Sequence, residues 1–312
     1  MSLNTILGAT ELGLIFAIMS LGIYITFKIL NFPDLTVDGS FTLGCVVSGI
    51  FAINHHPFLG ILFATLAGCF AGMMTGFLHT KMKVQYILAG IITMTGLYSI
   101  NLKIGGSKPN FSLYGFETIF SHFRNFLSST LHISNEVILK NHKLILLLLI
   151  LIIVTTLLYL FFKTQSGLAI RATGNNEEMV RASSINTDAM KIAGLALANA
   201  FVGLCASIYT QHQMFYDISQ GIGMMVVGLT SIIVGESIFG KRTLLNSFIS
   251  LSLGAILYRL LLSYALSLGM DPNDWKLLCA SLVAIVISFP TVKTYIQKRQ
   301  KRAKAKGGSK SC

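Results

Sequence analysis

The chain has 312 residues, of which 53% are hydrophobic and only 12% are charged, and its mean hydropathy is +0.70. Soluble globular proteins carry about 25% charged residues, so this composition excludes an ordinary soluble fold. The net charge of +12 raises the question of nucleic-acid binding. Eight of the positive residues lie within positions 293–312, where Tyr295 is the single aromatic residue, which favours a cytoplasmic basic tail over a nucleic-acid site.

Nine apolar runs follow one another along the chain, and we predict a membrane segment at each. They cover residues 5–30, 41–53, 58–78, 86–102, 144–162, 189–210, 222–239, 244–266 and 275–292. The second run is too short to cross as a regular helix and follows Pro33 and Gly39, so we interpret it as the second half of a broken helix. The expected fold class is an all-α polytopic membrane protein with eight to nine spans.

The distribution of Lys and Arg predicts which side each loop occupies. With nine crossings and a cytoplasmic basic tail, the amino terminus lies outside the cell. The predicted cytoplasmic segments then hold seventeen of the 24 Lys and Arg residues, and the predicted outer loops hold five. This bias has the sign of the positive-inside rule. We therefore expect a multi-pass protein of the cell membrane, with a permease-like membrane domain over 1–292 and a cytoplasmic carboxyl-terminal tail over 293–312.

Two segments between the runs differ from short loops. The outer stretch 105–142 carries Asn110, Ser112, Tyr114, Phe116 and Phe120, which fit either a short amphipathic piece at the surface or a solvent loop. The cytoplasmic stretch 163–191 contains a series of breaks, at Gly167, Gly174, Asn175 and Asn176. Glu177 and Glu178 are expected to open a short helix there that runs to Ser183, with acidic residues at its positive end.

A short pattern, Phe-x-Asp-aliphatic-hydroxyl, occurs at 32–36 and again at 215–219. Each copy follows an apolar run, the first and the sixth, and these two runs cross the membrane in opposite directions. Such a pair is typical of an inverted-topology repeat, in which broken helices meet within the bilayer and line a pathway. We interpret Asp34 and Asp217 as residues that both cap the following helix and line this pathway.

Asp38 is an ionisable residue near membrane depth, so we expect it to be paired or hydrated. The candidate pathway residues are Asn31, Asp34, Thr36, Asp38, Ser40, Asp217 and Ser219.

Other motifs carry no chemistry of their own. The stretch 235–243 approaches the nucleotide-binding pattern GxxxxGK[ST], but Arg242 replaces the hydroxyl residue and no strand precedes it, so we predict that this chain does not bind ATP. Glu236 is either a proton-relay carboxylate or, more simply, a partner of Lys241 and Arg242. The cysteines and histidines lack metal or catalytic spacing, so we predict no catalytic residue, metal or cofactor. Four glycines at positions 60, 68, 72 and 76 predict close helix packing.

Several stretches resemble a known family. They are ELGLIFA at 11–17, NFPDLTVDGSFTLG at 31–44, and GLAIRATGNN at 167–176 through to Gly235-Glu236. The chain up to about residue 292 is similar to the membrane permease subunit of ABC importers, of the branched-chain amino-acid and ribose permease type. The stretch 31–44 most resembles the tryptophan-transport-like branch.

This resemblance implies a permease that moves an amino acid, aromatic ones included, or a similar small solute. It implies three partners: a cytoplasmic ATP-binding subunit, an extracellular solute-binding protein and a second copy of the permease. Residues 167–188 would be the segment that couples to the ATPase, through Gly167, Arg171, Gly174, Asn175, Asn176, Glu177, Glu178 and Arg181. Ser183 and Ser184 depart from the family where a glycine is expected. The alternative is a self-contained secondary transporter or channel, for which an inverted repeat would serve equally well.

Overall fold

The computed structural model describes residues 3–130, 141–240 and 242–267, together with Leu277, Ser281 and Ala284. Within these residues, seven helical segments are long and apolar enough to cross a membrane. They are α1 (Leu3–Tyr24) continued by the π-helical turn η1 (Ile25–Ile29), α2 (Thr36–Ile53), α3 (Pro57–Thr80), α4 (Tyr86–Ile104), α7 (His142–Phe161), α10 (Thr187–Gln213) and α12 (Leu244–Ser267). A shorter apolar helix, α11 (Met224–Phe239), lies between α10 and α12. The protein is therefore an all-α multi-pass membrane protein, as predicted. The predicted last span, 275–292, apart from those three residues, and the basic tail lie outside the described residues.

The second apolar segment is longer than its sequence pattern predicts. The helix begins at Thr36 rather than at residue 41 and continues for 18 residues, so the prediction that this run is too short to cross is wrong. The irregular backbone comes before the helix, where Asn31 adopts a left-handed φ of 52°. The first turns of α2 contain polar residues, so a search for apolar runs places the start of this segment too late in the chain.

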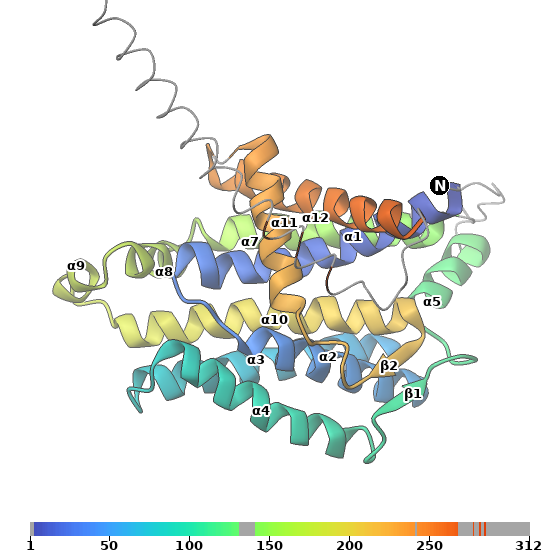
Figure 1. Ribbon diagram of the computed structural model, residues 1–312, viewed down its shortest axis with the longest axis horizontal. Coiled ribbons are helices and arrows are strands. Elements are labelled where there is room, and N and C mark those ends of the chain that lie inside the picture. The colour runs from blue at the N-terminus through green and yellow to red at the C-terminus, as the bar shows by residue number, and fades with distance from the viewer. Residues whose placement is uncertain are drawn as a thin grey trace, which may run out of the picture.

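The helix packing repeats between the two halves of the chain. In the first half α2 packs on α3, and in the second half α11 packs on α12. Helix α3 packs on α10 as α12 packs on α1, and α2 packs on α10 as α11 packs on α1. Each contact thus has a counterpart when α1, α2 and α3 are exchanged for α10, α11 and α12, which is the arrangement expected of an inverted repeat. In Figure 1 the long helices run side by side, whereas α11 runs steeply across them.

Glycines allow a very close helix contact between α3 and α10. A Cβ atom on Gly72 would lie 2.2 Å from the carbonyl oxygen of Leu195, and one on Gly68 would lie 2.3 Å from that of Asn199. These distances leave no room for a side chain, so the predicted role of these glycines in close packing is confirmed.

The two ends of the helix bundle carry different structures (Figure 1). At one end, which we call the α9 end, lie α8 (Gln165–Asn175) and α9 (Glu177–Ala182). At the other, which we call the β end, the antiparallel strands β1 (Asn110–Ser112) and β2 (Phe215–Asp217) pair, with Phe111 opposite Tyr216. The stretch after β1 forms the short helix α5 (Ile119–Asn125) and the turn η2 (Phe126–Thr130). The described part of 105–142 is therefore folded against the bundle through β2.

Candidate functional site

The first copy of the repeated pattern is buried between α1 and α2. Asp34 Oδ1 accepts a hydrogen bond from the backbone N–H of Thr36, the first residue of α2, at 2.9 Å. The N-cap of α2 is Leu35, so the prediction that Asp34 is itself the N-cap is wrong, and its carboxylate instead closes a turn just before the helix. Asp34 Oδ2 accepts a second bond from Asn199 Nδ2 of α10 at 2.7 Å. Thr36 Oγ1 shares a hydrogen bond of 2.6 Å with Thr75 Oγ1 of α3. The irregular segment before α2 is thereby fixed to both α10 and α3.

The second copy makes the same local turn in a different environment. Asp217 Oδ1 accepts a hydrogen bond from the backbone N–H of Ser219 at 2.8 Å, two residues on, as Asp34 does with Thr36. Asp217 lies in β2 at the β end, however, and Ser219 is exposed. Helix α11 begins only at Met224, so the prediction that Asp217 caps the following helix is wrong.

The cap of α11 comes instead from Asp38 of α2. Its Oδ2 accepts the backbone N–H of Gly223 at 2.8 Å, and its Oδ1 accepts that of Met225 at 2.9 Å. Gly223 has no side chain that could cap the helix and adopts a φ of 88°, which favours glycine. Asp38 thus places a carboxylate at the positive end of α11, and its expected pairing is found across 185 positions of sequence.

A cavity of about 210 Å³ opens beside this cap. It lies between α2, α4 and the segment that leads from β2 to α11, with Asp38, Thr42, Asn101 and Ile222 in its wall. Of the seven candidate pathway residues, Asp38 is the one that lines it. Thr36 and Ser40 are fully buried, and Asn31 lies near the α9 end.

Side-chain caps define the shape of the segment 163–191 at the α9 end. Thr164 accepts the backbone N–H of Gly167 before α8, Asn176 accepts that of Met179 before α9, and Asn186 accepts that of Ala189 before α10. Helix α9 covers Glu177–Ala182 with Ser183 as its C-cap, so the helix predicted from Glu177 to Ser183 is confirmed. Ser184 has a left-handed φ of 62°, a conformation that would favour the glycine expected at this turn.

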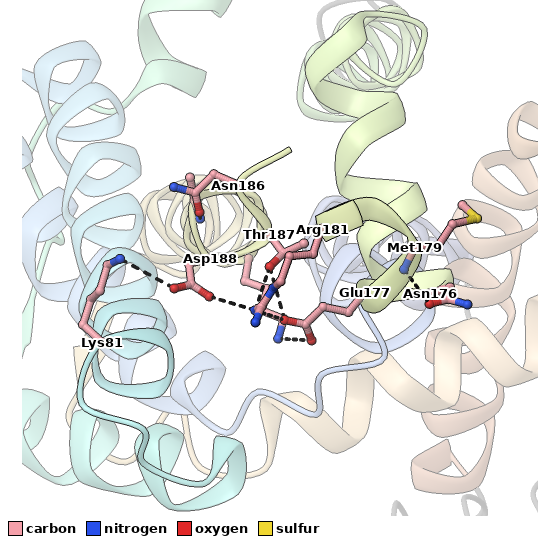
Figure 2. A network of polar contacts seen from close by, with 10 residues as sticks. Lys81, Asn176, Glu177, Met179, Arg181, Asn186, Thr187 and Asp188 are labelled. Atoms are coloured by element: carbon pink, nitrogen blue, oxygen red, sulfur yellow. Dashed lines mark hydrogen bonds and ion pairs between the residues drawn. The ribbon is translucent and has the colours of Figure 1, made fainter. Parts of the chain in front are cut away.

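Glu177 is the centre of a network within this segment (Figure 2). Its carboxylate contacts Lys191 Nζ at 2.5 Å and Arg181 Nη2 at 2.9 Å. Asp188 extends the network to Arg181 at 3.7 Å and to Lys81 of α3 at 3.6 Å. The hydrogen bond from Lys191 is the main cause that lowers the pKa of Glu177 below its ordinary value.

The neighbouring side chains of the segment point outward. Glu178 is exposed, and so is Met179, with 59% of its surface accessible. The other residues predicted to couple to an ATPase divide in the same way: Arg171, Asn175, Asn176 and Arg181 are exposed, whereas Gly167 is buried and Gly174 partly buried. The exposed residues can contact a partner, and the two glycines allow close packing.

Helix α8 docks on the end of the first span. Asn31 Nδ2 donates a hydrogen bond to the carbonyl oxygen of Gly174 at 3.0 Å. A Cβ atom on Gly174 would lie 1.7 Å from the carbonyl oxygen of Ile29, so only glycine fits this contact. The segment at the α9 end is therefore in direct contact with the irregular backbone that leads to Asp34.

An ion pair connects η1, the π-helical turn at the end of the first span, to α11. Lys28 Nζ of η1 lies 3.0 Å from Glu236 Oε2, and the two side chains are 33% and 13% exposed. The simpler sequence interpretation, a pair of Glu236 with Lys241 or Arg242, missed this long-range partner; Lys241 lies outside the described residues. In the part of the chain that the structure describes, no group of three His, Cys, Asp or Glu could hold a metal ion.

Comparison with known proteins shows similarity to transport permeases. The family model described as "Branched-chain amino acid transport system / permease component" matches residues 5–288. A tyrosine transport system permease protein of Clostridioides difficile is 36% identical over 282 residues, 90% of each chain. A ribose import permease protein of Haemophilus influenzae is 25% identical, over 91% of this chain and 84% of its own length. A nucleoside ABC transporter permease protein of Lactococcus lactis is 23% identical, over 77% of this chain and 75% of its own. No solved structure matches the chain significantly.

Proposed function

The chain belongs to the family of permease components of branched-chain amino acid transport systems, and from this premise we propose that it is the permease subunit of an ABC importer. In this role residues 1–292 form the translocation pathway, and a separate cytoplasmic subunit hydrolyses ATP. The carboxyl-terminal tail, 293–312, lies on the cytoplasmic side and the amino terminus lies outside.

The observation that carries the proposal is the docking of α8 on the end of the first span. The segment 167–188 has a shape defined by side-chain caps, exposes Glu178 and Met179, and touches Ile29 and Asn31 through Gly174. An ATPase that moved this segment would therefore act directly on the backbone before Asp34 and α2. A self-contained secondary transporter has no ATPase partner that such an exposed, capped segment would contact.

The substrate that we propose is an amino acid. The family description and the tyrosine permease relative support this class, and aromatic amino acids are the first to test. A solute-binding protein would deliver the amino acid at the β end, which lies opposite the ATPase contact (Figure 1).

We expect two copies of this permease per transporter, related by a two-fold axis. Helices α4 and α7 are both mostly uncovered, yet α7 is the most apolar span and α4 the least apolar. The uncovered face of α4 exposes Thr95, Tyr98 and Ser99. Such a face suits a neighbouring permease or a hydrated pathway better than it suits lipid.

Uptake by a reconstituted complex tests the proposal. The permease, its ATPase and its solute-binding protein would be placed in proteoliposomes with labelled L-tyrosine and, separately, labelled L-leucine and ribose. We expect uptake of an amino acid that requires ATP and the binding protein. Uptake by the permease alone, driven by an ion gradient, would instead establish the secondary-transporter alternative.

A further inference from the structure

Resting on this function, we infer that the cavity beside Asp38 is a recognition site for the ammonium group of the transported amino acid. Asn101 lines the cavity and has a buried side-chain oxygen without a hydrogen-bond partner among the described residues, and the rest of the wall offers further hydrogen-bond acceptors. Its volume of about 210 Å³ suits a solute smaller than the drug-sized ligands that fill about 300–1,000 Å³.

Asn101 of α4 provides the unpartnered atom. The residue is 1% exposed, and its Oδ1 has no hydrogen-bond partner among the described residues. Its Nδ2 donates to the carbonyl oxygen of Gly39 at 3.4 Å. Exchanging the amide oxygen and nitrogen would bring two oxygens together, so the orientation is fixed with the acceptor free. A buried acceptor of this kind is costly unless a ligand donates to it.

The hydroxyl groups in the cavity wall already donate their protons within the protein, so they offer a ligand mainly hydrogen-bond acceptors. Thr42 Oγ1 donates its proton to the carbonyl oxygen of Asp38, and Thr95 Oγ1 donates within α4 to the carbonyl oxygen of Ile91. Each hydroxyl oxygen keeps a lone pair, because a hydroxyl has one donor and two acceptor positions. These groups therefore favour a solute that brings its own N–H donors.

Asp38 adds negative charge to the same wall. Its oxygens accept the backbone N–H groups of Gly223 and Met225 and also interact with that of Met224, and a carboxylate has about four acceptor positions, so about one remains. An ammonium group has three donors and no acceptor, which matches Asp38, Asn101 and a threonine hydroxyl. Tyr98 and Ile222 provide aromatic and apolar surface for the remainder of the solute.

Thiol labelling tests the charge preference of the cavity in the full chain. Thr95→Cys, in a background with the five native cysteines replaced, would be treated in lipid nanodiscs with 2-aminoethyl methanethiosulfonate, a cation, and 2-sulfonatoethyl methanethiosulfonate, an anion. The exposed outer-loop variant Tyr114→Cys gives the intrinsic ratio of the two rates. We expect the cation-to-anion ratio at Thr95→Cys to exceed this reference about tenfold, the effect of one hydrogen bond to a charged group.

Two changes at Asn101 distinguish recognition from misfolding. Asn101→Leu removes the acceptor and should lower the ratio, whereas Asn101→Asp adds a charged acceptor and should raise it. A merely disturbed fold would not shift the ratio in opposite directions. Equal ratios at Thr95→Cys and Tyr114→Cys, absence of labelling at Thr95→Cys, or the same ratio in both Asn101 variants would overturn the inference.

Transport then connects the cavity to the substrate. In the reconstituted complex, Asn101→Leu should raise the KM for the amino acid about tenfold, while Thr65→Val, which removes a threonine hydroxyl of α3 outside the cavity, should not. An unchanged KM in Asn101→Leu would overturn the inference even if transport confirms the permease function. If the wild-type complex takes up no solute, the proposed function fails, and the labelling ratio still decides the charge preference of the cavity.

Discussion

Asn31 donates a hydrogen bond to the carbonyl oxygen of Gly174, at 3.0 Å and across 143 positions of sequence. Asn31 lies at the start of the irregular backbone that precedes α2, and Gly174 lies near the end of α8. The contact joins the segment exposed at the α9 end to the region where Asp34 meets α10. A displacement of α8 would therefore act directly on the backbone that leads to Asp34.

Gly174→Ala tests whether this contact couples the two regions. The added Cβ would lie 1.7 Å from the carbonyl oxygen of Ile29, so α8 must shift away, at a cost of about 1–3 kcal/mol. We expect faster hydrogen exchange in α8 and reduced ATP-driven uptake, while the protein stays in the membrane. Gly8→Ala in α1 is the matched control, because its Cβ would meet no described atom within 4 Å. Equal exchange rates in both variants would contradict the coupling.

The pair between Lys28 and Glu236 predicts a rescue by charge exchange. Lys28→Glu or Glu236→Lys alone places like charges 3.0 Å apart and should destabilise the protein by roughly 1–2 kcal/mol, since Lys28 is a third exposed. The double variant restores the pair and should recover most of this loss. Thermal unfolding of the three variants in nanodiscs measures the coupling. Additive losses in the double variant would show that the two residues do not interact.

The segment around α9 should loosen at acidic pH because of Glu177. The hydrogen bond from Lys191 lowers the pKa of this carboxyl below its ordinary value of 4.5. A carboxyl whose pKa is lowered in the folded state stabilises the fold at pH values above its ordinary pKa. This contribution to the free energy of unfolding is lost as the pH falls through the folded pKa. Limited proteolysis within 163–191 should therefore accelerate as the pH falls below the ordinary value of 4.5. Glu177→Gln should be cleaved faster at neutral pH and lose this pH dependence; an unchanged pH profile would refute the role of Glu177.

Burial predicts which pathway residues react with water-soluble thiol reagents. Thr36 and Ser40 are fully buried, so Thr36→Cys and Ser40→Cys should be protected in the resting permease, whereas the exposed Ser219→Cys should react. If the region around Asp34 opens during transport, ATP and the binding protein should make the two buried positions reactive. Protection of both throughout a working transport cycle would remove them from the pathway and leave Asp34 with a structural role only, in the turn before α2 and the hydrogen bond to Asn199.

Local sequence signals predicted the structure where its causes are local. Helix α9 was predictable because Asn176 caps it and Glu177 opens it within a few residues. The inverted repeat was predictable because the Asp34 and Asp217 copies share a pattern on oppositely directed spans. The length of α2 was not, because Thr36, Asp38 and Ser40 in its first turns are polar, so the apolar run begins only at residue 41.

Long-range partners could not be predicted from the sequence alone. Asp38 caps a helix 185 positions later, and Glu236 finds its partner at Lys28 rather than among its neighbours. Packing also decides which of the two acidic residues of α9 is exposed. Glu177 faces Lys191 of the next helix, and Glu178 faces away. A simultaneous change of both would therefore mix a folding defect with a binding defect.

The most direct test of the account is co-purification of the permease with its ATPase subunit after the double change Glu178→Lys and Met179→Glu. Both side chains are exposed on α9, so the permease should still fold and enter the membrane. Glu117→Lys at the β end is the matched control, because its side chain is 58% exposed at the opposite end of the bundle. We predict that the α9 variant loses the ATPase and the control keeps it. Normal recovery of the ATPase with the α9 variant would contradict the assignment of this segment as the ATPase contact.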